Sequence, residues 1–183
     1  SPDLTAAFGP PTAKADKHAG ALSFTDARIL AFPVRSLKGI FAWVSCPAVL
    51  DRFVRDAALA GRKPGFTTPK VDAGKALLSS RAVVGIGKNN SEAVFEEFAF
   101  AVADGAGDVA KAISELAIAD EATRARLVDH FAILPDDDFN HFVQHATEVV
   151  ARVALNYETK TVREGALFYQ EFLPPETIFY SVV

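Results

Sequence analysis

Two apolar segments joined by a short basic turn limit this chain to folds that contain an antiparallel hairpin. Residues 21–34 are rich in Leu, Ile, Phe and Val, and residues 40–46 repeat that composition, as expected for two paired strands. Residues 35–39 read Arg-Ser-Leu-Lys-Gly, which is typical of a turn because Gly39 can adopt a positive φ. Pro33 cannot donate a backbone hydrogen bond, so we expect an edge strand or a bulge there.

The predicted hairpin presents two cations, Arg35 and Lys38, at its tip. Cations on a rigid scaffold suit phosphate recognition, whereas a solvated tip without a ligand is the simpler alternative. A second basic stretch lies at residues 61–75, where prolines and glycines predict a long irregular loop. Its cations accompany Phe66, which we expect to be exposed, in a mixture used to bind single-stranded nucleic acid. A loop with no binding role fits this stretch equally well.

The remaining pattern is α+β, with hairpins and interspersed helices but without regular β-α-β alternation. A length of 183 residues fits one domain, within which residues 1–18 are predicted to be a linker. Helical periodicity predicts helices at residues 47–60, 107–119, 120–130 and 136–151. Apolar and β-branched runs predict strands at residues 76–86, 92–103, 131–134, 152–157, 165–172 and 177–183.

Charge is divided unevenly along the chain. Residues 1–90 carry 13 Lys and Arg against 6 Asp and Glu, whereas residues 91–183 carry 6 against 17. Such a division favours contact between the basic side and a polyanion, or head-to-tail association between copies of the chain. The alternative is that the charges mix once the chain folds.

Acids and histidines in one predicted helix raise the question of a metal site. Asp136, Asp137 and Asp138 begin this helix, where acids more often cap free N–H groups than bind a hard cation. His141 and His145 lie one turn apart, a spacing that can hold zinc, but no third ligand is evident. We predict no metal site, and a metal-dependent hydrolase is the weakest of three functional hypotheses.

Cys46 is the only cysteine and ends a predicted strand, so we expect a buried structural thiol in a reducing, cytoplasmic environment. No apolar run reaches the ~18 residues of a membrane-spanning helix, and no signal peptide is evident, so we expect no membrane partner. The sequence contains no Met and begins at Ser1, which predicts part of a longer protein.

Several short motifs together resemble one protein family. They are Phe-Gly-Pro-Pro at 8–11, His-Ala-Gly-Ala at 18–21, Thr-Asp-Ala-Arg at 25–28, Phe-Pro-Val-Arg-Ser-Leu-Lys-Gly at 32–39, Pro-Asp-Asp at 135–137, Thr-Glu-Val-Val-Ala-Arg at 147–152 and Gly-Ala-Leu-Phe-Tyr at 165–169. The combination resembles the backbone subunit of the Cmr complex, the type III-B CRISPR effector, within the RAMP superfamily. The resemblance implies a ferredoxin-like (RRM-like) core with helical insertions and a thumb-like element, for which residues 61–75 are our candidate.

The resemblance also implies a function. Copies of the subunit stack head-to-tail along a guide CRISPR RNA, together with other Cmr subunits, and complementary target RNA is cleaved with Mg²⁺ or Mn²⁺. The candidate RNA-binding residues in this chain are Arg28, Arg35, Lys38, Arg62, Lys63 and Lys70. The alternative is a structural assembly module that does not contact nucleic acid.

The resemblance leaves the catalytic role of this chain unassigned. The family's catalytic aspartate lies in an N-terminal segment that this sequence does not contain. The family often has two acids after the Tyr of the 165–169 motif, and these positions are Gln170 and Glu171 here. We therefore expect Glu171 to be an accessory catalytic residue and expect the chain itself to hold no metal. A charged residue on the solvent face of a strand is the alternative.

Overall fold

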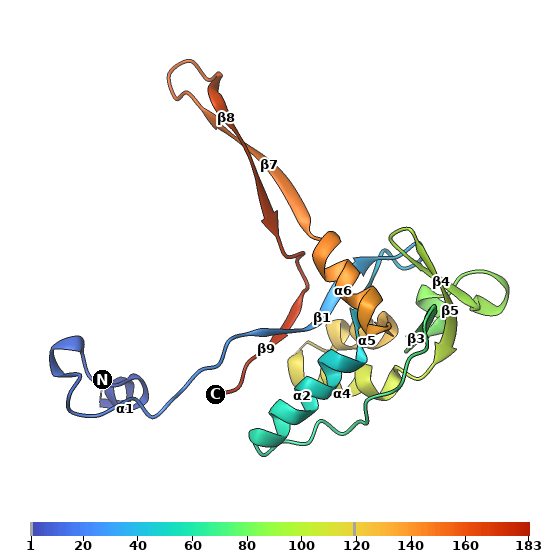
Figure 1. The fold of residues 1–183 in the computed structure, drawn as a ribbon, viewed down its shortest axis with the longest axis horizontal. Coiled ribbons are helices and arrows are strands. Elements are labelled where there is room, and N and C mark those ends of the chain that lie inside the picture. The colour runs from blue at the N-terminus through green and yellow to red at the C-terminus, as the bar shows by residue number, and fades with distance from the viewer. Residues whose placement is uncertain (1, 119) are drawn as a thin grey trace.

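A seven-stranded mixed sheet lies at the centre of the computed structural model, which describes residues 2–118 and 120–183 (Figure 1). Its order is β4-β5-β3-β6-β2-β1-β9. The strands are β1 (Arg28–Arg35), β2 (Phe41–Ser45), β3 (Lys75–Leu78), β4 (Glu92–Phe95), β5 (Phe98–Asp104), β6 (Phe131–Ile133) and β9 (Ile178–Tyr180). This arrangement confirms the α+β class. Residue 1 of the predicted linker and residue 119, which ends a predicted helix, lie outside the described residues.

Helices lie around this sheet (Figure 1). They are α2 (Pro47–Leu59), α3 (Arg81–Val84), α4 (Gly107–Ala117), α5 (Glu121–Asp129) and α6 (Asp136–His145). α2 begins as predicted, with Pro47 in its first turn and Leu50 and Phe53 turned into the core. Cys46 precedes this helix, and burial raises the pKa of its thiol to about 12. The prediction of a buried structural thiol is therefore confirmed, because a thiol with so high a pKa carries little thiolate at neutral pH.

The core between sheet and helices is rich in aromatic side chains. The largest fully buried ones are Trp43, Phe32, Phe95, Phe131 and Phe142. The Trp43 indole packs edge-on against Phe41, and its N–H donates to the carbonyl of Glu176 at 2.8 Å. This hydrogen bond ties the segment before β9 to the middle of the sheet.

β1 and β2 form the predicted antiparallel hairpin, although β1 begins at Arg28 and not at residue 21. Pro33 is opposite Trp43 of β2. The pairing of β1 with β9 extends only to Ala31, after an irregularity that follows Ile29. Pro33 therefore lies where β9 no longer pairs with β1, which confirms the expectation of an edge or a bulge.

Two predicted strands are wrong in their extent. The strand predicted at 92–103 is two strands, β4 and β5, joined by a turn in which Glu96 has φ of +50°. The strand predicted at 76–86 ends at Leu78, and α3 follows it. The β4–β5 turn also meets the end of β1, because Ser36 bridges Phe95 and the Glu96 amide donates to the Arg35 carbonyl at 2.9 Å. One edge of the sheet is thereby brought to the β1–β2 turn.

β7 (Glu148–Leu155) and β8 (Val162–Phe172) form a separate antiparallel hairpin that projects from the body (Figure 1). The helix predicted at 136–151 is therefore too long: α6 ends at His145, and the β-branched residues that follow favour a strand. Cross-strand partners place Val150, Phe168 and Phe172 on one face and Val153, Leu167 and Tyr169 on the other. Exposed apolar side chains thus cover both faces of the hairpin.

The N-terminal region and residues 61–75 complete the chain. Residues 1–18, predicted as a linker, contain α1 (Pro2–Phe8) and a 3-10 turn, η1 (Thr12–Lys14), both apart from the body in Figure 1. A second 3-10 turn, η2 (Lys88–Asn90), precedes β4. Residues 61–74 are irregular and residue 75 begins β3, and this segment packs against the core through Phe66 and Val71. The element that projects is the β7–β8 hairpin. No helix among the described residues is long and apolar enough to cross a membrane.

Candidate nucleic-acid interface

Arg35, at the end of β1, is held by a carboxylate from the β4–β5 turn. Its guanidinium donates from Nε and Nη2 to both carboxylate oxygens of Glu96, over distances of 2.6 to 3.1 Å. Hydrogen bonding to Glu96 raises the pKa of Arg35 above its usual value. The Arg35 side chain is 83% exposed, so a ligand can reach it, but a phosphate must compete with Glu96 for the guanidinium.

Lys38 lies half-buried in the β1–β2 turn. Its Nζ donates to the backbone carbonyl of Gly85 at 2.9 Å and to Oδ1 of Asn90 at 3.4 Å. Two residues further on, Ile40 has φ of +73°, a strained conformation for a β-branched residue. Lys38 therefore fastens a strained turn to the loop between α3 and β4, and its ammonium group already has two acceptors.

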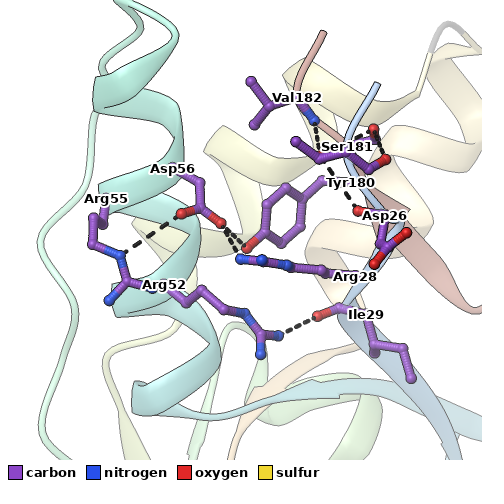
Figure 2. Close-up of polar contacts among 10 residues, drawn as sticks. Asp26, Arg28, Ile29, Arg52, Arg55, Asp56, Tyr180, Ser181 and Val182 are labelled. Carbon is purple, nitrogen blue, oxygen red and sulfur yellow. Dashed lines mark hydrogen bonds and ion pairs between the residues drawn. The ribbon is translucent and has the colours of Figure 1, made fainter. Parts of the chain in front are cut away.

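Arg28, at the start of β1, belongs to a network that joins three elements (Figure 2). Asp56 of α2 accepts hydrogen bonds at Oδ2 from Arg28 Nη1 at 2.9 Å and from the Tyr180 hydroxyl of β9 at 2.8 Å. The hydrogen bond from Tyr180, together with the positive charge of Arg28, lowers the pKa of Asp56. Arg52 reaches away from Asp56 and donates to the carbonyl of Ile29 at 3.3 Å. The network fixes β1, α2 and β9 to one another.

The lowered pKa of Asp56 predicts a pH-dependent contribution to stability. An unfolded Asp has a pKa of about 3.9, so this contribution is complete above that value and is lost as the pH falls through the lower folded pKa. We expect Asp56→Asn to be less stable than the unmodified chain at neutral pH, because the amide keeps the shape but not the charge. The difference between their urea midpoints should shrink as the pH is lowered from about 7 towards 2. A constant difference over this range would show that ionised Asp56 does not stabilise the fold. The control is Asp72→Asn, at an exposed acid beside Lys75, which should have a smaller effect.

The three candidate cations of the 61–75 segment, unlike Arg28, Arg35 and Lys38, have no bonding partner among the described residues. Within the part of the chain that the structure describes, the side chains of Arg62, Lys63 and Lys70 are exposed and make no ion pair or hydrogen bond. Arg62 and Lys63 also line a cleft of about 550 Å³ between α2, this segment and the start of α4. The prediction of an exposed Phe66 is wrong, because its ring is half-buried and stacks on Phe53 with centroids 6.4 Å apart. The segment offers free charges without an open aromatic surface.

Glu171, the expected accessory catalytic residue, is exposed near the base of the β7–β8 hairpin. Its Oε1 accepts a hydrogen bond from Oγ1 of Thr147 at 2.5 Å. Gln170 pairs with Val150, and adjacent residues of a strand point to opposite faces. Residues 170 and 171 are therefore on different faces of the hairpin and cannot act on one group from the same side.

The acids and histidines of α6 separate into two arrangements. Asp136 caps a neighbouring helix, because its Oδ1 accepts a hydrogen bond from the Ala48 amide in the first turn of α2 at 2.9 Å. His141 and His145 lie side by side, with ring centroids 4.5 Å apart. No group of three potential metal ligands occurs among the described residues.

Within the described residues, two ion pairs connect the basic half of the sequence to the acidic half. Arg35 pairs with Glu96, and Arg81 of α3 pairs with Asp104 of β5, each at 2.6 Å. Part of the uneven charge is therefore neutralised within one copy of the chain, while the 61–75 segment keeps its positive charge.

The mixed sheet and the surrounding helices are consistent with the core of a RAMP protein. The sequence profile of the RAMP superfamily matches residues 4–181, and the chain belongs to this superfamily. Within it, the chain is similar to the CRISPR system Cmr endoribonuclease Cmr4 of Pyrococcus furiosus, with 43% identity over 180 residues. That match covers 96% of this chain but 59% of the relative, so the chain spans less than two thirds of that protein. The resemblance to the Cmr backbone subunit is thereby confirmed.

Solved structures agree with this family assignment. The oligomeric crystal structure of Cmr4 from Pyrococcus furiosus superposes with a TM-score of 0.70 and 36% identity, covering 88% of this chain and 56% of that one. A second crystal structure of Cmr4 gives a TM-score of 0.63 and 25% identity, covering 97% and 62% of the two chains. A chain of the type III-B Cmr-beta complex bound to target RNA, at 15% identity and a TM-score of 0.65 over 98% of this chain and 61% of that one, shares the fold alone.

Proposed function

We propose that this chain is part of a guide-RNA-binding backbone subunit of a type III-B CRISPR effector. The observation that carries the proposal is the 43% identity to the Cmr4 endoribonuclease, which extends over 96% of this chain. The likeness to the oligomeric form of Cmr4 supports association with further copies of the chain. Association with other Cmr subunits is part of the same proposal. The chain covers 59% of that relative, so the proposed activity is that of the longer protein.

The free cations of the 61–75 segment are the first candidates for phosphate contacts. A guanidinium or ammonium without a carboxylate partner gains most from a phosphate, since nothing has to be displaced. Arg62, Lys63 and Lys70 meet this condition, while Arg35 must leave Glu96. In this scheme Lys38 and Arg28 have a structural role. Lys38 holds the β1–β2 turn, and Arg28 holds the start of β1.

The β7–β8 hairpin supplies a second contact with RNA. The two-stranded hairpin has exposed apolar side chains on both faces. Because exposed apolar patches mark interaction sites, we expect binding partners to cover both faces. Phe168 on one face and Tyr169 on the other can stack on bases, which every RNA offers. We assign this hairpin to the paired guide and target RNA.

Target cleavage is the second part of the proposal. Glu171 is at the base of the hairpin and can orient a water or a hydroxyl group through its free carboxylate oxygen, while Thr147 holds the other oxygen. Gln170 cannot exchange a proton in this way. In this scheme cleavage requires Mg²⁺ or Mn²⁺. The described residues contain no group of three potential metal ligands, so residues of the longer protein would complete the coordination of the metal ion.

A titration of labelled single-stranded RNA with the chain at two salt concentrations tests the proposal. Phosphate contacts release counterions, so we expect binding to weaken steeply as salt rises, with a slope of about −0.7 per contact on logarithmic axes. A structural assembly module without nucleic-acid contact would show no binding at low salt. That result, repeated with the chain in its longer natural form, would contradict the RNA-binding function.

A further inference from the structure

A second cleft lies where the body meets the base of the β7–β8 hairpin. It encloses about 640 Å³, which is within the ~300–1,000 Å³ that small-molecule sites occupy. The β1–β2 turn, the β4–β5 turn, α6 and the start of β7 form its walls, and Pro174 and Pro175 line it from the segment after β8. Its mouth is therefore beside the hairpin that we assign to RNA.

The cleft is lined with aromatic rings. Phe98 of β5 is 37% exposed, and its ring meets the edges of His141 and Phe142 at centroid distances of 5.0 and 5.6 Å. His145 lies against His141 on the same wall, and Phe41 lines the cleft from β2. Exposed aromatic and imidazole rings of this kind stack on unpaired bases in RNA-binding proteins.

The charges of the cleft favour a base over a phosphate. Glu97 and Glu148 line it, and within the described residues neither carboxylate has a hydrogen bond or an ion pair within 4.0 Å, although the charge of Glu97 helps to raise the pKa of Arg35. Among the described residues that line the cleft, Arg35 is the only Lys or Arg, and its guanidinium is already paired with Glu96. An anionic phosphate is repelled there, whereas the N–H groups of a base find carboxylate acceptors.

We infer that this cleft is a subsite for one unpaired nucleobase that carries an exocyclic amino group, stacked on Phe98 and His141. A carboxylate accepts a hydrogen bond from the N4 amino group of cytosine, and adenine and guanine also present amino groups. Uracil presents two carbonyl oxygens, which the carboxylates of Glu97 and Glu148 disfavour. The inference rests on the proposed function, because the base belongs to the bound guide or target RNA.

Free nucleosides test the subsite without phosphate. The chain has a single Trp, and Phe41 joins the cleft to Trp43, whose indole N–H gives one side-chain resonance to follow by NMR. We expect cytidine to shift this resonance with a dissociation constant in the millimolar range, and uridine to bind about 10-fold more weakly. Phe98→Ala and the bulkier Phe98→Leu should each weaken cytidine binding about 10-fold, because both remove the stacking ring. Phe8→Ala, at an exposed ring of α1 outside both the cleft and the hairpin, is the matched control and should leave cytidine binding unchanged.

Each outcome separates this inference from the proposed function. Equal binding of cytidine and uridine, or cytidine binding that both Phe98 variants leave intact, would overturn the subsite even if RNA binds. Tighter binding of a tri-lysine peptide than of cytidine at the same resonance would also overturn it and assign the cleft to a basic protein segment. Cytidine binding that is tighter than uridine binding and depends on Phe98 would uphold a base-binding cleft, whereas an RNA titration without salt-sensitive binding would count against the proposed function.

Discussion

Replacing Trp43 with alanine should lower the free energy of unfolding by about 3–5 kcal/mol, the range for removing a large aromatic side chain from a packed core. Trp43 is 1% exposed in the middle of β2, where it packs edge-on against Phe41 and within reach of the Arg126 guanidinium. Alanine leaves a cavity at the centre of the sheet. It also removes the hydrogen bond to the Glu176 carbonyl, which helps to hold β9 in place.

Two further variants separate these contributions. Trp43→Phe keeps most of the apolar volume but loses the indole N–H, so we expect a smaller loss, with the hydrogen bond contributing about 0.5–1.5 kcal/mol. Tyr157→Ala removes an aromatic ring that is 87% exposed, and it should change stability by less than about 1 kcal/mol. Urea unfolding followed by far-ultraviolet circular dichroism measures all three. A loss for Trp43→Ala no larger than that for Tyr157→Ala would show that Trp43 is not part of the core.

The elements that the sequence predicted well carry their signals locally. Pro47 begins α2, and the amide of Thr123 donates to the Asp120 side chain at 2.8 Å at the start of α5, as expected for a helix cap. The β1–β2 hairpin and the final strand near 177–183 follow from short apolar runs around turn residues. In each case the residues that decide the element lie within a few positions of it.

The errors arose where a distant segment or an unusual backbone decides the structure. The split of residues 92–103 depends on Glu96 in the left-handed region, which its residue type does not favour. Phe66 looked exposed because its partner, Phe53, lies in another element. Such partners are set by the tertiary fold and leave no trace in local periodicity.

The same limit applied to the candidate site. Arg28 and Lys38 looked like free cations in the sequence, yet Asp56 and the Gly85 carbonyl occupy them in the fold. The sequence therefore identified the basic stretches, but it could not show which of their cations are free to bind a phosphate. The structure moves the first candidates for phosphate contact from the hairpin tip to the 61–75 segment.

Replacing Arg62, Lys63 and Lys70 together with alanine should therefore weaken binding of single-stranded RNA about 100-fold at low salt. Each free cation is expected to contribute about 1 kcal/mol through a charge-assisted hydrogen bond to a phosphate, and three such losses multiply to this factor. The logarithmic salt slope should also become shallower by about 2, at about 0.7 for each phosphate contact removed. Circular dichroism should show an intact fold, since within the described residues these side chains make no ion pair or hydrogen bond.

A control of equal charge distinguishes a local contact from a general effect of net charge. Lys14, Lys88 and Lys111 are exposed elsewhere on the chain, and replacing all three with alanine removes the same three charges. If RNA is held by the 61–75 segment, this control should retain most of the affinity. Arg35→Ala should also have a smaller effect than the triple variant, because its guanidinium has to leave Glu96 before it meets a phosphate. Equal losses in the 61–75 variant and the charge control would refute a local site, and a larger loss for Arg35→Ala would return the phosphate contact to the hairpin tip.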